Sequence, residues 1–253
     1  MPMIVNGIYR YPVKGFSGEE LPQADLQPGQ TIAGDRMFAL GRPGLAFDVT
    51  NPVWMPKTNF LALVRDARLA ELRTRYDDSS GLLSVGSGDE ELLTVDLSHA
   101  AGRAELEAFL ADFLSDEISG SPTVLRADGH SFSDLDAKVV SLINMDTVRA
   151  LDRHTGTNTH PLRFRANLYF DGAPAWSELD WVGREITIGT ASLQVIKRTR
   201  RCAATNVNPE TALRDMNIPA VLQRNWGHSD LGIYARVIDA GTIRAGDQLR
   251  LRD

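Results

Sequence analysis

The only cysteine of this sequence follows a run of basic residues. Cys202 comes directly after Lys197–Arg201, a segment in which four of the five residues are basic. The thiolate is the reactive and metal-binding form of cysteine, and nearby cations favour that form. A cationic pocket in an acidic protein also suits an anionic ligand such as a phosphate. The alternative is a solvated basic turn beside a buried, inert cysteine, because free cysteine is among the most buried residue types.

A second segment alternates strictly along the chain. In Arg163–Phe170 one set of positions holds Phe164, Ala166, Leu168 and Phe170, and the other holds Arg163, Arg165, Asn167 and Tyr169. This period of two predicts a strand that buries its phenylalanines and turns Arg165 and Asn167 toward a cleft. An arginine fork and an amide on one face can hold a planar polar ligand or a phosphate. The alternative is the solvent face of a half-exposed strand.

Two cationic residues near the N-terminus stand beside glycines. Lys14 precedes Gly15 at the end of the strand-like Ile8–Val13, and Arg36 follows Gly34 and Asp35 where a turn leads into another strand. Taken alone, both places are ordinary transitions between strand and turn.

Length and composition exclude several classes of protein. The chain has 253 residues, of which 43% are apolar and 24% charged, as in a soluble protein of one large or two small domains. One cysteine excludes an intrachain disulfide framework, a Cys-rich zinc site and a protein-held iron–sulfur cluster. The net charge of −6 argues against non-specific binding to nucleic acid or to anionic membranes.

The sequence lacks targeting signals and the common catalytic motifs. No basic start leads into an apolar core, and no apolar run approaches roughly 18 residues. We therefore expect a cytoplasmic protein with neither membrane nor nucleic-acid partners. There is no phosphate loop, HExxH pair, EF-hand or nucleophile elbow.

Short apolar segments between turn formers dominate the first half and predict β-hairpins. These segments are Ile8–Val13, Met37–Leu40, Phe60–Val64, Leu82–Val85 and Leu92–Leu97. An amphipathic helix is predicted over Arg103–Leu114, where apolar residues recur every three or four positions. The segment Ser115–Asp136 then turns polar, which predicts a domain boundary there.

The second half is also mostly β. Strands are expected at Lys138–Ile143, Arg163–Phe170, Glu185–Ile188, Ser192–Lys197, Ile233–Ile238 and Gln248–Leu251. Asn144 is expected to cap a short helix over Met145–Arg153, and Glu210–Gln223 is expected to be a partly helical loop. The predicted fold class is therefore mostly β (α+β) with a few helices.

Taken in order, these segments resemble the MOSC family, named for the C-terminal domain of molybdenum cofactor sulfurase. The second half matches through Arg163–Gly189, RCAATNVNPET (Arg201–Thr211) and Leu231–Leu249. The first half resembles the MOSC N-terminal β-barrel domain through Ile8–Leu21 and Gly34–Leu40. The layout is similar to that of the mitochondrial amidoxime-reducing component and its bacterial relatives. It implies a MOSC N-terminal β-barrel-like domain at 1–118 and a MOSC β-barrel domain at 119–253.

The resemblance implies a site, residue by residue. Cys202 matches the family cysteine whose thiolate ligates molybdenum, which would make it the metal ligand and the catalytic residue. Arg201 matches a residue that lines the cofactor. Lys14 and Gly15 match a Lys–Ser pair at the pterin phosphate, although glycine can offer only its backbone N–H. Arg36 matches an arginine that contacts the phosphate or the pterin.

Further site residues follow from the second half. Arg165 and Asn167 match the arginine and asparagine of an R-P-N motif, with alanine in place of the proline. Asn144, or alternatively Ser141, matches a polar position near the cofactor. Tyr234 matches the tyrosine of an F-G-[IV]-Y segment.

The cationic positions of both halves should converge. Lys14, Arg36 and Arg165 lie far apart in the sequence, but we expect all three in one cleft between the domains, where ligand sites are common.

The resemblance implies an enzyme of the molybdenum cofactor (Mo-molybdopterin) that reduces N-oxygenated small molecules such as amidoximes or N-hydroxylated bases. The molybdopterin dithiolene would supply the other sulfur ligands, and the cofactor would carry the redox step. Electrons would come from a separate ferredoxin- or cytochrome b5-like protein with its reductase. Pyridoxal phosphate binding is a further implied property. The alternatives are a non-catalytic carrier of the cofactor or of sulfur, and a MOSC-like binding protein that has lost the metal.

Overall fold

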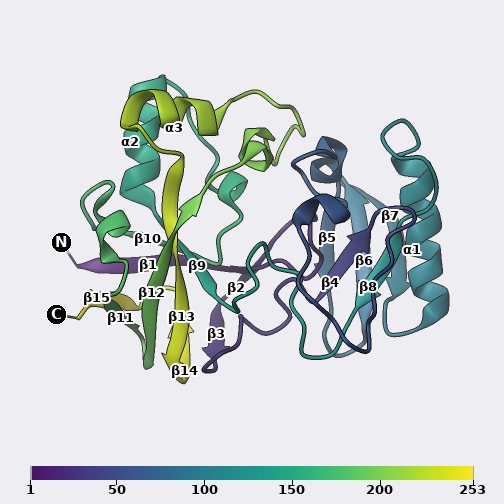
Figure 1. The fold of residues 1–253 in the computed structure, drawn as a ribbon, viewed down its shortest axis with the longest axis horizontal. Coiled ribbons are helices and arrows are strands. Elements are labelled where there is room, and N and C mark those ends of the chain that lie inside the picture. The colour runs from purple at the N-terminus through teal and green to yellow at the C-terminus, as the bar shows by residue number, and fades with distance from the viewer. Residues whose placement is uncertain (1, 253) are drawn as a thin grey trace.

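Seven strands close a β-barrel around one of the two main cores (Figure 1). The computed structural model describes residues 2–252. Around the barrel the order is β10 (Leu168–Asp171), β9 (Val140–Asn144), β13 (Asp230–Asp239), β12 (Ala191–Arg200), β11 (Glu185–Ile188), β15 (Gln248–Leu251) and β1 (Met3–Arg10). β1 pairs back onto β10 and closes the ring. β9 and β10 are parallel, and all other neighbours in the ring are antiparallel.

A second body lies beside the barrel (Figure 1). Its elements are the sheet of β5 (Arg73–Tyr76), β6 (Leu82–Ser87) and β7 (Glu90–Asp96), the pair β4 (Phe38–Gly41) and β8 (Thr123–Arg126), and helix α1 (Ala100–Phe113). α1 buries Leu106 and Leu110, which belong to the predicted apolar stripe. Gly102 lets α1 approach β7 closely, because a Cβ there would lie 2.1 Å from the carbonyl oxygen of Asp96.

Two further helices, α2 (Met145–Thr155) and α3 (Ile218–Trp226), pack at one end of the barrel (Figure 1). The side chain of Asn144 caps α2 by accepting a hydrogen bond from the Asp146 N–H, as predicted. The 3₁₀ segments are η1 (Lys57–Asn59), η2 (Ala67–Glu71), η3 (Pro161–Phe164), η4 (Ser177–Trp181) and η5 (Ala203–Asn206). Within residues 2–252 no helix has the length and apolar character needed to cross a membrane.

The two packed bodies do not follow a single cut of the chain. β1, β2 (Glu19–Leu21) and β3 (Gln23–Leu26) belong to the first half, yet β2 extends the barrel sheet and β3 pairs with β14 (Gly241–Arg244). Conversely, β8 follows residue 118 but pairs with β4 in the second body. A division at 118/119 therefore separates two halves of the chain, whereas in space β1 of the first half completes the barrel of the second half.

Most of the predicted strands are present, but the one at Phe60–Val64 is wrong. Its residues form turns around an isolated bridge between Gly41 and Phe60. The segment is apolar because it is buried, and its backbone is satisfied by other means: the Asp66 carboxylate accepts a hydrogen bond from the Ala62 N–H at 2.8 Å. A short buried apolar segment has the sequence pattern of a strand even when, as here, its pairing is limited to one isolated bridge.

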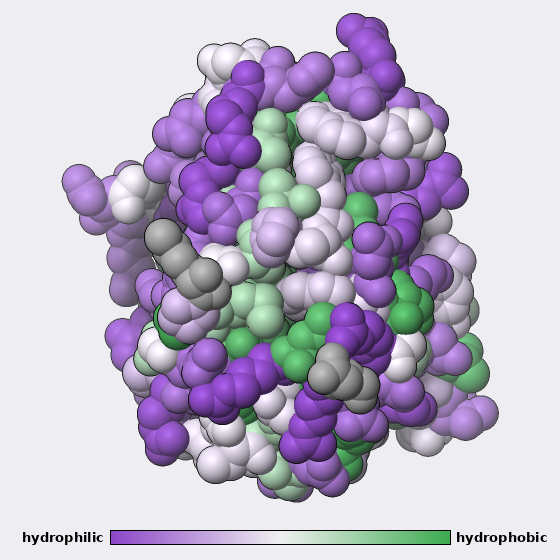
Figure 2. All heavy atoms as spheres, turned by 90° about the vertical axis from the view of Figure 1, so that its left-hand side faces the viewer, coloured by the Kyte–Doolittle hydropathy of each residue, from purple (hydrophilic) through white to green (hydrophobic). Residues whose placement is uncertain are grey.

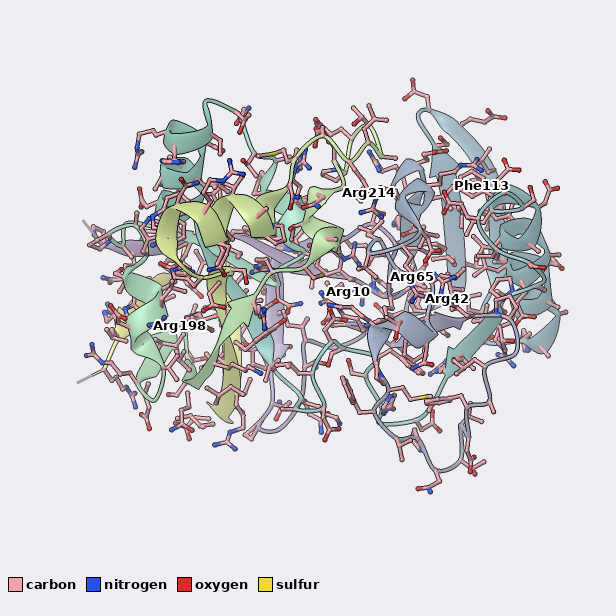
Figure 3. The ribbon with its side chains drawn as sticks, turned by 45° about the horizontal axis from the view of Figure 1, so that its top comes forward. Arg10, Arg42, Arg65, Phe113, Arg198 and Arg214 are labelled. Atoms are coloured by element: carbon pink, nitrogen blue, oxygen red, sulfur yellow. The ribbon has the colours of Figure 1, made fainter. Side chains whose placement is uncertain are left out.

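Arginine side chains link the two bodies (Figure 3). Arg10 on β1 pairs with Glu19 at 2.8 Å and with Asp78 of the second body at 2.5 Å. Arg214 donates a hydrogen bond to the carbonyl oxygen of Leu63 at 2.8 Å. The first strand begins, and the last strand ends, on the side of the barrel that faces away from the second body (Figure 1). This face has a polar rim and apolar side chains toward its middle (Figure 2).

Candidate functional site

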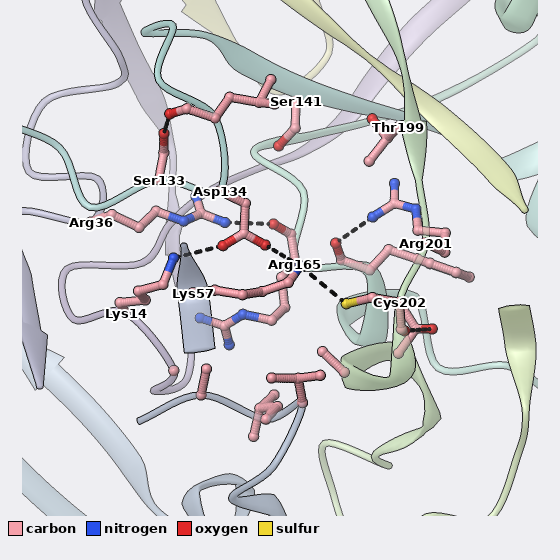
Figure 4. Close-up of a pocket in the computed structure, with 18 of the residues that line it drawn as sticks. Lys14, Arg36, Lys57, Ser133, Asp134, Ser141, Arg165, Thr199, Arg201 and Cys202 are labelled. Atoms are coloured by element: carbon pink, nitrogen blue, oxygen red, sulfur yellow. Dashed lines mark hydrogen bonds and ion pairs between the residues drawn. The ribbon is translucent and has the colours of Figure 1, made fainter. Parts of the chain in front are cut away.

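A pocket lies between the barrel and the second body (Figure 4). Its walls come from the loop after β1, the segment 57–64, the loop before β9 and the end of β12, and it holds about 930 Å³ including its open mouth. Eight of the nine residues assigned from the sequence line it: Lys14, Gly15, Arg36, Arg165, Asn167, Arg201, Cys202 and Tyr234. The three cations expected to converge are thus in one pocket.

Cys202 stands where β12 ends and η5 begins. Its carbonyl oxygen accepts hydrogen bonds from the N–H and the hydroxyl of Thr205, at 3.0 and 2.8 Å, which fixes the turn. The residue is half-buried, and its Sγ lies 3.3 Å from Nζ of Lys57. A sulfur held at a rigid strand end, beside a cation and within a pocket, is suited to act as a metal ligand or a nucleophile.

Cations outnumber anions in the pocket wall. The charged lining residues are Lys14, Asp35, Arg36, Lys57, Asp134, Arg163, Arg165, Arg200 and Arg201. Seven cations and two carboxylates give this wall a formal charge of +5, in a protein whose net charge is −6. Positive charge concentrated in a partly enclosed site attracts an anionic ligand.

Two of these arginines have left-handed backbone conformations. Arg36 and Arg165 have φ angles of 50° and 51°, and they are two of the four non-glycine residues with positive φ in the described chain. Each guanidinium carbon lies 4.4 Å from the centroid of the Tyr11 ring, and Nη2 of Arg36 donates to the carbonyl oxygen of Arg165 at 2.8 Å. A left-handed residue costs about 1–2 kcal/mol and tends to occur at functional sites.

Arg165, which is half-buried, and Arg201, which is buried, hold their charges without a carboxylate partner. Neither forms an ion pair within residues 2–252; both donate to backbone carbonyl oxygens, Arg165 to that of Phe16 at 2.5 Å. Burial lowers the pKa of both groups, that of Arg165 to about 10, with the nearby Arg36 adding to the effect. Uncompensated buried cations indicate a site that is completed by an anion.

Three buried polar atoms at this pocket have no hydrogen-bond partner in the described part of the chain. They are Nε of Arg163, Oγ1 of Thr199 and Nη2 of Arg201. An unpaired buried donor costs about 1–3 kcal/mol. All three belong to residues that line the pocket.

Asp134 joins two lysines on another wall. Its Oδ1 lies 2.6 Å from Nζ of Lys14 and its Oδ2 lies 3.0 Å from Nζ of Lys57. Burial lowers the pKa of Lys14, although Asp134 opposes this. Burial alone would raise the pKa of Asp134, but the two lysines outweigh it and hold that pKa well below its ordinary value. Burial alone would lower the pKa of Lys57, but Asp134 and Cys202 outweigh it and raise that pKa.

The backbone conformation and close surroundings of Gly15 explain why this chain has glycine where the resemblance led us to expect serine. Its φ is +93°, and a Cβ there would lie 3.0 Å from the carbonyl oxygen of Leu61 and 3.2 Å from Leu69 Cδ1. A serine would be strained in both respects. The Gly15 N–H donates to no acceptor in residues 2–252, and the residue lines the pocket.

Asn144 does not line the pocket, which corrects the assignment from sequence. It is fully buried, and its Nδ2 donates to the carboxylate of Glu178 at 3.0 Å while its Oδ1 caps α2. Ser141, the alternative, does line the pocket. The two residues lie three positions apart on β9, so their side chains leave opposite faces of the strand.

The strand predicted over Arg163–Phe170 begins only at Leu168. The preceding residues form η3, and the left-handed Arg165 turns the chain into the pocket. The residues Phe164, Leu168 and Phe170 are buried as predicted. Asn167 is buried too, and its Oδ1 accepts a hydrogen bond from Ser141 Oγ at 2.8 Å while its Nδ2 donates to the carbonyl oxygen of Tyr9. It supports the wall and leaves little of its amide for a ligand.

Only part of the basic run before the cysteine reaches the pocket. Arg200 and Arg201 line it, whereas Lys197 and Arg198 do not, and Arg198 lies on the outer side of the barrel (Figure 3). The cation at the sulfur is Lys57, 145 residues away in the sequence. Reasoning from the sequence missed both Lys57 and Asp134, because no local pattern marks either residue.

Family models match almost the whole chain. Residues 2–120 match the MOSC N-terminal beta barrel domain and residues 121–250 match the MOSC domain. This chain therefore belongs to the MOSC family, and its mostly β architecture is that of an N-terminal beta barrel domain followed by a MOSC domain. The two matches meet between residues 120 and 121.

The relatives at sequence level are distant. The chain is 26% identical over 212 residues to mitochondrial amidoxime-reducing component 1 of Xenopus laevis, a match covering 79% of this chain and 58% of that protein. The mouse (Mus musculus) protein of the same name is 24% identical over 128 residues, which cover 46% of this chain and 37% of that protein. The chain thus matches only part of the length of these relatives. Among solved structures, the YuaD protein from Bacillus subtilis has a TM-score of 0.48 at 14% identity, over 99% of this chain and 96% of that one.

The residues of the pocket fit the molybdenum cofactor that the family name implies. The wall offers one soft sulfur ligand and an excess of positive charge for a phosphate. In the part of the chain described, no three His, Cys, Asp or Glu side chains gather as a metal site. A single cysteine is enough to hold a metal only if the cofactor supplies further ligands, as the dithiolene of molybdopterin would.

Proposed function

We propose that this protein is a molybdenum-cofactor-dependent reductase of N-oxygenated small molecules. The observation that carries the proposal is a half-buried cysteine in a pocket with two arginines, Arg165 and Arg201, that form no ion pair within residues 2–252. Membership of the MOSC family and the distant similarity to amidoxime-reducing components support a function related to this cofactor.

In this proposal the chain's own residues bind and orient the cofactor. Lys14, Arg36, Arg165 and the Gly15 N–H hold the terminal phosphate as charge-assisted donors. The sulfur of Cys202 ligates the metal. When bound, the cofactor supplies the two-electron redox centre. The strained backbone of Arg36 and Arg165 fixes the positions of both guanidinium groups before the ligand arrives.

The net reaction balances with two electrons and two protons. An N–OH group takes up both, the N–O bond breaks, and an N–H group and water form. The single cysteine is too few to hold an iron–sulfur cluster in this chain, so the proposal draws the electrons from a separate ferredoxin- or cytochrome b5-like protein.

Turnover tests the proposal directly. Protein from a host that makes molybdopterin is supplied with reduced methyl viologen and benzamidoxime, and benzamidine is measured. We expect formation of benzamidine by the wild type and none by Cys202→Ser. A metal-loaded wild type that turns over no N-oxygenated compound would instead favour the carrier. Pyridoxal phosphate binding and a cytoplasmic location stay predictions.

A further inference from the structure

Lys57 reaches the candidate metal ligand from the opposite side of the cleft. It opens η1 in the first half of the chain, whereas Cys202 lies two residues after the end of β12 of the barrel and caps η5. Its Nζ donates to Cys202 Sγ at 3.3 Å and to Asp134 Oδ2 at 3.0 Å (Figure 4). Three segments distant in the sequence therefore meet at the Lys57 ammonium.

Asp134 fixes where this ammonium lies. Its second oxygen is taken by Lys14 at 2.6 Å, so the carboxylate bridges two cations. One carboxylate cannot neutralise both, and a positive charge is left beside the sulfur. The Lys57 side chain is 31% exposed, so water screens this charge only in part.

We propose that Lys57 is a positioning residue that orients the Cys202 sulfur and, through an N–H···S bond, makes the ligated metal easier to reduce. The proposal rests on the proposed function. Groups that hydrogen-bond to metal ligands fix their orientation and tune the metal, and hydrogen bonds to ligand sulfur change the reduction potential. A cation at the sulfur stabilises the more negative, reduced state of the centre.

Three variants separate this role from simple packing. Lys57→Met removes the charge and keeps the length of the side chain, and Lys57→Arg keeps a cationic donor. Lys197→Met is the matched control, since it removes the same charge five residues before Cys202, from a lysine that does not line the pocket. Each protein is made in a molybdopterin-competent host and assayed for molybdenum per chain, thermal unfolding and the midpoint potential of the molybdenum by EPR-monitored titration.

We expect Lys57→Met to make reduction about tenfold less favourable, which is about 59 mV lower for one electron. Lys57→Arg and Lys197→Met should stay near the wild-type potential, with all melting temperatures similar. Loss of metal in Lys57→Met alone, at an unchanged melting temperature, supports the same role.

Two results overturn the inference. One is a wild-type potential in metal-loaded Lys57→Met. The other is loss of metal and a lowered melting temperature in both Lys57 variants, which would make Lys57 a packing residue. Absence of molybdenum from the wild type would instead contradict the proposed function itself.

Discussion

Replacing Arg165 with glutamine should weaken anion binding without weakening the fold. A pKa lowered from 12.5 to about 10 means that about 3 kcal/mol disfavours the buried charge at neutral pH. This cost is present below about pH 10, where the folded protein keeps the charge. The substitution removes it, but also removes the charged hydrogen bond to the Phe16 carbonyl and the contact with Tyr11, worth about 1–3 kcal/mol together.

The two effects nearly cancel, so we expect the free energy of unfolding of cofactor-free Arg165→Gln to stay within about 1–2 kcal/mol of the wild type. Loss of charge-assisted bonds to a phosphate should weaken its binding by about tenfold to a hundredfold. At a phosphate concentration that is 100 times the wild-type Kd, the wild type gains about 2.7 kcal/mol, and a variant with tenfold weaker binding gains about 1.4 kcal/mol.

The assay is urea unfolding of protein from a host without molybdopterin, with and without inorganic phosphate. Arg198→Gln is the control, because the same change is made on the outer side of the barrel. An Arg165→Gln protein that loses several kcal/mol without phosphate, and keeps the full phosphate effect, would refute the reasoning: Arg165 would then be structural.

Three further predictions follow from local geometry. Gly15→Ser, which restores the family residue, should lower the free energy of unfolding by about 1–2 kcal/mol in urea, because φ is +93° and the side chain meets Leu61; equal stability would contradict this. Asn144→Ala should lower the melting temperature, since it removes a helix cap and a bond to a buried carboxylate, while molybdenum per chain stays unchanged; a loss of metal at normal stability would return Asn144 to the site. Asp134 has a pKa below its ordinary 3.8, so it stabilises the fold above about pH 3.8 and loses this effect as the pH falls further. The stability difference between wild type and Asp134→Asn, measured by urea unfolding from pH 3 to pH 7, should therefore be largest at the upper end; a constant difference would contradict it.

Helices and strands with a periodic pattern were predictable because the spacing of apolar residues along the sequence shows which face is buried. The stripe on α1 and the strands β11 and β15 have the bounds, or nearly the bounds, that the pattern predicted. The Asn144 cap was readable for the same local reason. Phe60–Val64 was not, since a buried turn and a buried strand have the same composition.

The site was only partly predictable. The motif around Cys202 and the R-A-N segment identified positions that do line the pocket. Lys57 contacts Cys202, which is 145 residues away in the sequence, and Asp134, which is 77 residues away. No local periodicity predicts contacts of such sequence separation. The choice between Ser141 and Asn144 depended on which face of β9 meets the cleft, which is a property of the packed barrel. The pairing of β1 with β10 and β15 is equally non-local.

The central claim is that Cys202 and its cationic pocket hold a molybdenum cofactor. The most direct test is the number of molybdenum atoms and pterins per chain, measured by elemental and fluorescence analysis on wild type and Cys202→Ser from one molybdopterin-competent host. We expect close to one of each in the wild type. We expect little molybdenum in Cys202→Ser, with a similar melting temperature, because serine replaces a soft ligand by a hard, protonated hydroxyl of similar size. Equal molybdenum in the two proteins, or none in the wild type, would contradict the claim.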